Sequence, residues 1–404
     1  MIMVNMPKQS NGDKIIPIKY INNKIIVQKQ SADNKIDGLY EFDIKEEAFK
    51  EIFTLKNKNN KGRVEMFHVS YEYIEHLKDM SNMYLDVIEY EDKDKVRIKF
   101  YEINFTSYNT TLVFEYLVNP GFYYKGISYL RDGFFLFKLG NEKYDDNKHT
   151  LHFLYDVKEG KIYPVLEDIF GMTSSSYKIF IKDSLEYLFF DEWYIDFYEE
   201  EELISRQSEL SKNNSSEIDF DYLFNNSFKV IEINKFIQQI KAGNKNIEYA
   251  TIDSAKMNGW IRYCGMNENN IYYIRKLYDE STIEIISVSK DDFKLTSIKK
   301  LDKIDRIENV CIGSKDKYLV EEIDDKLVIK SLSLDTVVFT YYKNEESKFE
   351  RFINIVNDMY LIIYGEKENV NEDSEYYKII KMTNDELICV RNVWFQNDTM
   401  VLIY

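Results

Sequence analysis

Residues 122–168 read FYYKGISYLRDGFFLFKLGNEKYDDNKHTLHFLYDVKEGKIYPVLED, and the rest of the chain repeats their pattern. Four short apolar or aromatic runs are separated by Asp, Asn, Gly or Lys: Gly126–Leu130, Gly133–Leu139, Thr150–Val157 and Lys161–Leu166. Runs of this length between turn residues are typical of strands. Arg131–Gly133 and Lys158–Gly160 have the composition of tight turns between antiparallel strands. The segment therefore predicts one four-stranded antiparallel meander.

The turn between the last two strands of this meander recurs along the chain. In each copy an apolar, a polar and an apolar residue are followed by a turn-forming residue. Seven copies are present, at Phe42–Lys45, Tyr101–Asn104, Tyr155–Lys158, Ile231–Asn234, Ile286–Ser289, Leu332–Asp335 and Ile380–Thr383. Their successive spacings are 59, 54, 76, 55, 46 and 48 residues, which is a near-constant period with one outlier.

A period of this size with four strands per unit is typical of a β-propeller blade, because one meander must stack against neighbours to bury both faces. Runs such as Phe134–Phe137 are apolar at every position, as expected for a sheet covered on both sides. The sequence predicts an all-β fold, a propeller of seven four-stranded blades that forms a single domain over residues 1–404. The hairpin pattern at residues 393–404 leaves eight blades as the alternative. We expect this hairpin to pair near the N-terminus, because it has no outer strands of its own.

The longest spacing contains the polar segment Glu199–Asn226, which predicts an insertion within the fourth blade. Its middle is rich in Ser and Asn and buries little apolar surface, so we expect it to lie outside the blades. Phe220, Tyr222 and Phe224 form an apolar end that suggests a docking segment for a partner. The alternative is an excursion of the chain that has no partner.

Composition and charge restrict the partners and the compartment. The net charge of −17 argues against binding nucleic acid through its phosphates and against an anionic membrane surface. Cys264, Cys311 and Cys389 lie in apolar strands of three different units, which favours buried free thiols and a reducing compartment. The first residues show neither a signal peptide nor a membrane span. We therefore expect a cytoplasmic monomer.

The most unusual local composition is FFDEWYIDFY at residues 189–198. Aromatic rings interleaved with carboxylates can stack on a sugar or hold a cation. Asp191, Glu192, Trp193 and Tyr194 are therefore candidate ligand-binding residues. The alternative is a blade strand packed against the next sheet and followed by an acidic turn.

Metal and cofactor motifs are not recognisable in the sequence. His149 and His152 are three residues apart in a predicted strand, so their side chains are expected on opposite faces. The chain has no nucleophile elbow, phosphate-binding loop or dinucleotide fingerprint. We predict no metal site and no cofactor, and we nominate no catalytic residue.

The hairpin Leu154–Ile162 and its repeat Leu39–Lys45 resemble the outer strands of bacterial β-propellers of the TolB and lactonase-like kind. The resemblance implies binding at a central channel or top face, and some such propellers are hydrolases or lyases. Two functions follow. The first is a non-enzymatic binding or protein-interaction module for an unknown protein or small molecule. The alternative is a hydrolase or lyase acting on a small or carbohydrate substrate. The absence of a recognisable nucleophile or metal cluster favours the first.

Overall fold

The computed structural model describes residues 1–4, 6, 14–21, 23–30, 36–54, 64–68, 82–92, 95–104, 107–131, 133–141, 143, 150–165, 176–194, 225–255, 259–277, 282–302, 307–312, 316–343, 347–367, 375–390, 392–396 and 399–403. These residues fall into two compact units. The N-terminal unit contains Pro7–Glu202 and Asn225–Ser254. The C-terminal unit contains Ala255–Tyr404 together with Met1–Met6.

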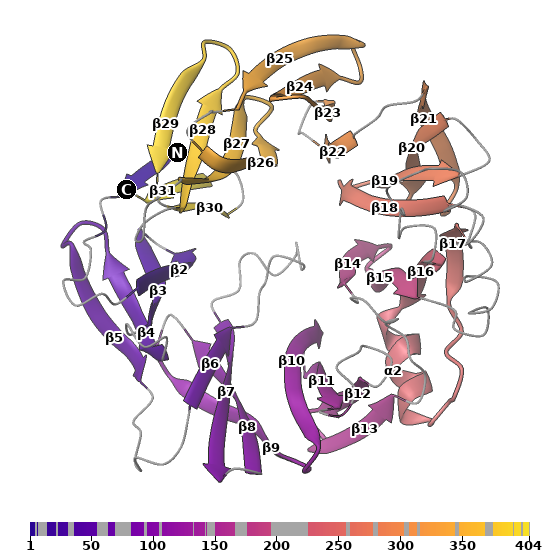
Figure 1. The fold of residues 1–404 in the computed structure, drawn as a ribbon. Coiled ribbons are helices and arrows are strands. Elements are labelled where there is room, and N and C mark those ends of the chain that lie inside the picture. The colour runs from indigo at the N-terminus through magenta and orange to yellow at the C-terminus, as the bar shows by residue number, and fades with distance from the viewer. Residues whose placement is uncertain are drawn as a thin grey trace. The chain divides into compact units, whose positions relative to one another are not determined.

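The N-terminal unit has four four-stranded antiparallel sheets among its described residues (Figure 1). In each sheet the strands are hydrogen-bonded in chain order, as in a meander. Blade 1 contains β2 (Lys14–Ile21), β3 (Lys24–Gln30), β4 (Ile36–Asp43) and β5 (Ala48–Thr54). Blade 2 contains β6 (Val64–His68), β7 (Asn82–Asp92), β8 (Lys95–Asn104) and β9 (Thr110–Val118). Blade 3 contains β10 (Phe122–Arg131), β11 (Phe134–Asn141), β12 (Leu151–Asp156) and β13 (Lys161–Val165). Blade 4 contains β14 (Ser176–Lys182), β15 (Leu185–Tyr194), β16 (Asn225–Glu232) and β17 (Ala250–Ser254).

The C-terminal unit has three further sheets of this kind among its described residues. Blade 5 contains β18 (Gly259–Met266), β19 (Asn270–Leu277), β20 (Thr282–Ser289) and β21 (Leu295–Asp302). Blade 6 contains β22 (Ile307–Ile312), β23 (Lys317–Ile323), β24 (Lys326–Ser331) and β25 (Thr336–Tyr342). Blade 7 contains β26 (Ser347–Val356), β27 (Tyr360–Lys367), β28 (Glu375–Lys381) and β29 (Glu386–Val390).

The predicted fold class, an all-β propeller of seven four-stranded blades, is confirmed by these strands and their order. The meander predicted from residues 122–168 is blade 3, although its first strand begins earlier, at Phe122. Gly133 and Gly160 lie in its two predicted tight turns with φ of 75° and 63°. Glycine adopts this left-handed conformation without the steric cost that a Cβ imposes.

The C-terminal hairpin belongs to a separate three-stranded sheet. It consists of β30 (Asn392–Gln396) and β31 (Thr399–Ile403), and β31 pairs in parallel with β1 (Ile2–Val4). The hairpin therefore pairs with the N-terminal strand, as expected. The eight-blade alternative is wrong, because this sheet has three strands and one of its strand pairs is parallel.

Blade 4 departs from the repeat between its last two strands. The recurring turn pattern predicts a tight turn at Ile231–Asn234, but helix α2 (Ile233–Lys241) begins there instead. Its buried residues, Ile233, Phe236, Ile237 and Ile240, have the spacing of one helix face. Within the described ranges, no helix has both the length and the apolar character that crossing a membrane requires.

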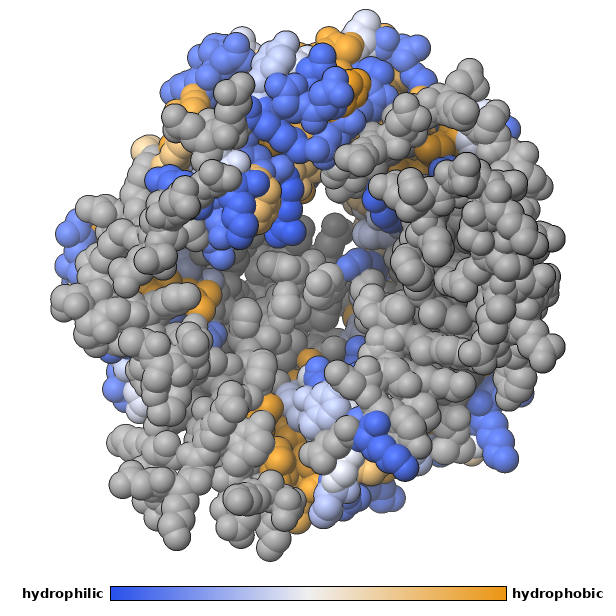
Figure 2. Space-filling view, in the orientation of Figure 1, coloured by the Kyte–Doolittle hydropathy of each residue, from blue (hydrophilic) through white to orange (hydrophobic). Residues whose placement is uncertain are grey.

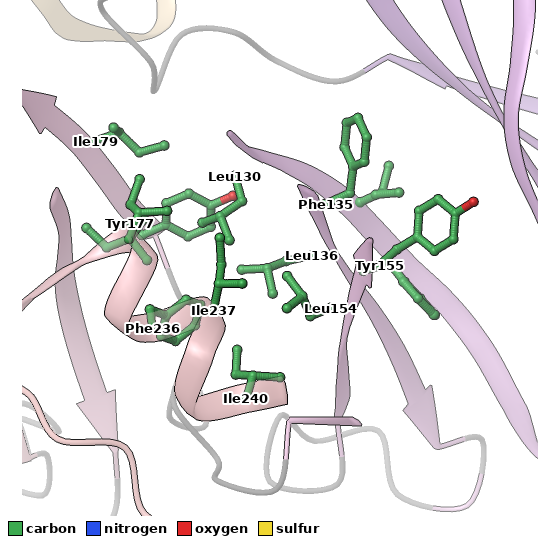
Figure 3. Packing of buried hydrophobic residues seen from close by; sticks show 14 of the residues in the cluster. Leu130, Phe135, Leu136, Leu154, Tyr155, Tyr177, Ile179, Phe236, Ile237 and Ile240 are labelled. Carbon is green, nitrogen blue, oxygen red and sulfur yellow. The ribbon is translucent and has the colours of Figure 1, made fainter. Parts of the chain in front are cut away.

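The two faces of blade 3 pack against blade 2 and blade 4. On one face, Phe135 contacts Phe100 of blade 2, with ring centroids 4.8 Å apart. On the other face, Leu136 and Leu154 lie beside Ile237 of α2 in one apolar cluster (Figure 3). This alternation follows from strand geometry, in which successive side chains point to opposite sides of the sheet.

The C-terminal unit is held together by apolar clusters between consecutive sheets. One cluster joins blades 5 and 6, a second joins blades 6 and 7, and a third joins blade 7 to the hairpin. In the third cluster Met400 and Leu402 pack with Ile362, Ile379 and Val390. Figure 2 shows a mainly hydrophilic outer surface over β24, β25 and β29, with scattered hydrophobic residues.

Candidate functional site

Polar side chains from three consecutive strands of blade 3 meet on one face of the sheet. Lys125 lies on β10, Lys138 on β11 and His152 on β12. Lys138 and His152 are direct cross-strand partners. The Lys125 Nζ donates a hydrogen bond of 3.2 Å to Oγ1 of Thr150, which precedes His152 by two residues. We call Lys125, Lys138, Thr150 and His152 the blade 3 cluster.

Glycine positions shape the cluster. The pairing of β10 with β11 is irregular between Tyr124 and Gly126, where Gly126 has a φ of 133°. A bulge of this kind changes the direction of a neighbouring side chain, here Lys125. A Cβ at Gly140 would overlap the Tyr123 ring and lie 2.7 Å from the Lys125 Cε. Because Gly140 on β11 has no side chain, the side chains of Tyr123 and Lys125 can occupy the space beside it.

The cluster lies on the face of blade 3 that is turned toward α2. Lys138 follows Leu136 by two residues, and His152 precedes Leu154 by two, so these residues share a face. Leu136 and Leu154 pack against α2 (Figure 3). Further along this face, the buried Asp156 accepts a hydrogen bond from Lys241 at the end of α2. The cluster thus continues the face that packs on α2, with His152 buried and Lys125, Lys138 and Thr150 half-buried.

Burial and mutual repulsion lower the basicity of the cluster. His152 is only 5% exposed, and burial, reinforced by the charges of Lys138 and Lys125, lowers the pKa of its imidazole to about 3. Burial and the charge of Lys125 lower the pKa of Lys138 to about 8. At pH 7 the imidazole of His152 is therefore neutral, and Lys138 is charged but close to its titration range.

The backbone of the candidate residues Asp191, Glu192, Trp193 and Tyr194 forms the end of β15, where it pairs with Asn225–Phe228. Their side chains lie outside the described residues, as do Phe220, Tyr222 and Phe224 entirely. Arg131 at the end of β10 lies 3.5 Å from Glu186 at the start of β15, measured from Nε to Oε2. The Lys125 end of β10 and the Asp191–Tyr194 backbone therefore lie toward the same end of blades 3 and 4. Both sets of sequence candidates stay predictions.

A second polar cluster lies between blades 6 and 7 and is centred on the carboxylate of Glu350, which is 5% exposed. It accepts hydrogen bonds from Tyr341 at 2.6 Å, Tyr376 at 2.5 Å, Lys378 at 2.6 Å and Ser347 at 3.3 Å. Burial and the hydrogen bond to Glu350 raise the pKa of Tyr376 to about 12. The tyrosines therefore remain neutral donors. Because the donors surround the carboxylate, this cluster stabilises the contact between the two blades rather than presenting a binding site.

The predicted cysteine chemistry is partly confirmed. All three cysteines are free thiols. Cys311 is buried, and burial raises the pKa of its thiol to about 12. The expectation of burial is wrong for Cys389, which is exposed. It lies on β29, the last strand of blade 7, where one side of the strand faces solvent.

Among the described residues, no group of three or more His, Cys, Asp or Glu side chains has an arrangement that could hold a metal ion. The predicted divergence of His149 and His152 cannot be compared with the structure, since His149 lies outside the described residues. His152 itself is buried and lies on the same face of blade 3 as Leu154.

The sequence reading missed the blade 3 cluster, although one signal was present. Phe134–Leu139 is apolar at every position except Lys138. A lysine in the middle of a strand that is otherwise apolar is unusual, because burying an ammonium group is costly. The convergence of Lys125 and His152 on it depends on strand register and on the bulge at Gly126.

Comparison with known proteins identifies the fold but no family. No family model matches the sequence, and no curated protein matches it either. Among solved structures, a prolyl endopeptidase is similar over 94% of this chain, with a TM-score of 0.51 and 10% sequence identity. Prolyl oligopeptidase B from Galerina marginata is similar over 96% of this chain, with the same TM-score and identity. The β-propeller domain of the Trilobed protease from Pyrococcus furiosus covers 97% of this chain at a TM-score of 0.44.

The likeness to the two prolyl peptidases, at 10% identity, concerns the fold and nothing finer. The chain spans about half the length of the two prolyl peptidases, 50% and 52%. The resemblance to TolB and lactonase-like propellers stays a prediction. The activity of the similar structures is not assigned to this chain at this level of identity, because one fold hosts many unrelated functions.

Proposed function

We propose that this chain is a non-enzymatic binding module built on a β-propeller, and that blade 3 holds its ligand. The observation that supports the proposal is the convergence of Lys125, Lys138, Thr150 and His152 from adjacent strands onto one face. Ligand sites typically combine a mostly apolar lining with a few placed polar groups. Side chains on paired strands are held more firmly than side chains on loops, which favours selective binding.

The surroundings of the cluster fit this role. The apolar residues Leu136 and Leu154 continue the same face toward α2. The Tyr123 ring lies beside Lys125, whose Nζ is 5.6 Å from the ring centroid. An aromatic ring next to polar groups provides a flat surface on which part of a ligand can stack.

The enzymatic alternative, a hydrolase or lyase acting on a small or carbohydrate substrate, also has its best candidate in this cluster. A general base works best when its pKa lies near the operating pH. Lys138, with a pKa lowered to about 8 by burial, meets that condition. In an enzyme of this kind, Lys138 would accept a proton from the substrate.

The test is a thermal-shift screen of the whole chain against a panel of small acids, sugars, amines and short peptides. We expect at least one compound to raise the melting temperature of the wild-type protein but not that of Lys138→Met. Lys161→Met is the matched control, because Lys161 is an exposed residue on β13 of the same blade. Compounds that stabilise Lys138→Met as much as wild type would contradict binding at blade 3. Turnover of a stabilising compound, lost in Lys138→Met, would favour the enzymatic alternative.

A further inference from the structure

We propose that two copies of this chain associate through β25 (Thr336–Tyr342), the outer strand of blade 6, which pairs edge to edge with the same strand of a second copy in an antiparallel arrangement. This association goes beyond the proposed function and rests on different observations from the blade 3 cluster. It would replace the expectation of a monomer, which took no account of the edges of the sheets.

The outer side of β25 is a sheet edge. The strand is the last of its sheet and pairs with β24, and no other strand among the described residues pairs with it. An edge strand presents backbone N–H and C=O groups that a further strand can bind. The side chains of Val337 and Tyr342 are 54% and 66% exposed, and Val338 is exposed as well. The edge therefore offers both backbone groups and apolar side chains to a partner.

The composition of β25 differs from that of the other outer strands. Its sequence, TVVFTYY, contains neither a charged residue nor a proline. Charged residues and prolines are common means by which an edge strand resists pairing with another chain. Each of the other six outer strands contains at least one of them: Lys50 and Glu51 on β5, Glu115 on β9, Lys161 and Pro164 on β13, Asp253 on β17, Lys299, Lys300 and Asp302 on β21, and Glu386 on β29. The outer strand best suited to pairing with another chain is thus β25.

A bulge at Val338 interrupts the pairing of β25 with β24. Bulges can also hinder edge-to-edge pairing. The outer strands β5, β9, β17 and β21 have a similar irregularity, however, in addition to their charged residues. The bulge is therefore a shared feature of these strands, and it does not supply the charge that β25 lacks.

Opposite charges at the two ends of β25 favour a second copy as the partner. Asp335 precedes the strand and Lys343 follows it. In an antiparallel pair of identical strands, the Asp335 end of each copy lies beside the Lys343 end of the other, whereas a parallel pair would bring like charges together. Within the chain, Asp335 forms an ion pair with Lys299, and Lys343 forms one with Glu322. A carboxylate has two acceptor oxygens and an ammonium group has three donors, so each can bind a second partner.

Pairing of β25 with itself follows a two-fold axis, because both copies contribute the same surface. Among the described outer strands of one chain, β25 alone has this uncharged composition. The contact therefore occupies the edge of both copies, and it gives a dimer rather than a fibre.

The experiment is sedimentation velocity of the whole chain over a range of concentrations, at about 0.15 M salt to screen the repulsion between two acidic chains. We expect the wild-type protein to form a dimer that dissociates on dilution. Val337→Lys places a charge on the edge and should raise the dissociation constant about tenfold or more. The matched control is Leu117→Lys, because Leu117 is an exposed apolar residue on the outer strand β9. Its dissociation constant should stay within about twofold of wild type.

A mixture of two charge variants tests the antiparallel arrangement. Asp335→Lys alone brings like charges together at both ends of the strand pair, and so does Lys343→Asp alone, so each variant should dimerise less than wild type. In an equimolar mixture of the two variants, opposite charges meet again at both ends, and the dimer should be recovered. Far-ultraviolet circular dichroism of each variant checks that the strands are retained.

Three outcomes would overturn the inference. The wild-type protein could remain a monomer at every concentration, Val337→Lys could weaken the dimer no more than Leu117→Lys does, or the mixture could dimerise no better than its components. None of these outcomes bears on binding at blade 3, which the thermal-shift screen tests by itself.

Discussion

The pairing of β31 with the N-terminal strand β1 gives a quantitative prediction for the C-terminal hairpin. Met400, Val401, Leu402 and Ile403 are between 0% and 4% exposed. Burying one side chain of this size contributes about 1.5–3 kcal/mol, so the four together contribute about 6–12 kcal/mol. That range is comparable with the whole stability of a typical domain, about 5–15 kcal/mol. Deleting residues 393–404 should therefore abolish cooperative unfolding of the C-terminal unit.

A single substitution tests the same contact without deleting the hairpin. Leu402 is 0% exposed and packs with Ile362, Ile379 and Val390 of blade 7. Leu402→Ala should lower the free energy of unfolding by about 2–5 kcal/mol, because it leaves a cavity in a closely packed cluster. The assay is urea unfolding followed by circular dichroism. Leu334→Ala is the control, since Leu334 is 69% exposed in the turn between β24 and β25 and its loss should change stability by less than about 0.5 kcal/mol. Equal stability of Leu402→Ala and Leu334→Ala would refute the packing of the hairpin on blade 7.

Two further predictions concern the polar clusters. The imidazole of His152 has a folded-state pKa of about 3 against an ordinary value of 6.5, so the unfolded chain binds more protons between these pH values. The free energy of unfolding should therefore fall as pH drops from 6.5 toward 3, by up to about 5 kcal/mol. His152→Gln should flatten this dependence in urea titrations at several pH values, and an unchanged slope would contradict the burial of His152. For the second cluster, Lys378→Met should destabilise the protein by about 3–5 kcal/mol, because it removes a charged partner from a buried carboxylate. Lys378→Met combined with Glu350→Gln should recover part of that loss in the same assay, and a double variant as unstable as the sum of both changes would argue against their coupling.

Most of the fold could be predicted from the sequence because its determinants are local. Turns such as Val157–Gly160 are specified by a few adjacent residues, and blade sheets are built from strands that are neighbours in the chain. The helix α2 was missed because Ile231–Asn234 matches the turn template, although Ile233, Phe236, Ile237 and Ile240 follow a helical period. The parallel pairing of β1 with β31 involves opposite ends of the chain, and its geometry has no local signature.

The site was much harder to predict than the fold. Lys138 is visible in the sequence as a break in an apolar run, but its neighbours depend on register. The irregular pairing at Gly126 decides which face Lys125 occupies, and a shift of one residue would move it to the opposite side. Composition instead drew attention to Asp191–Tyr194, where aromatic and acidic residues are densest. A segment rich in aromatic and acidic residues has groups that can bind a ligand. A binding site also requires that such side chains lie close together in the folded protein.

The most direct test of the proposed binding site is a crystal of the whole chain soaked in a compound that raises the melting temperature of the wild-type protein in the thermal-shift screen. The account predicts electron density for the compound within hydrogen-bonding distance of the Lys138 Nζ, and no such density in Lys138→Met crystals treated in the same way. Density for the compound only at other places, or equal density in the Lys138→Met crystals, would contradict the claim that blade 3 holds the ligand.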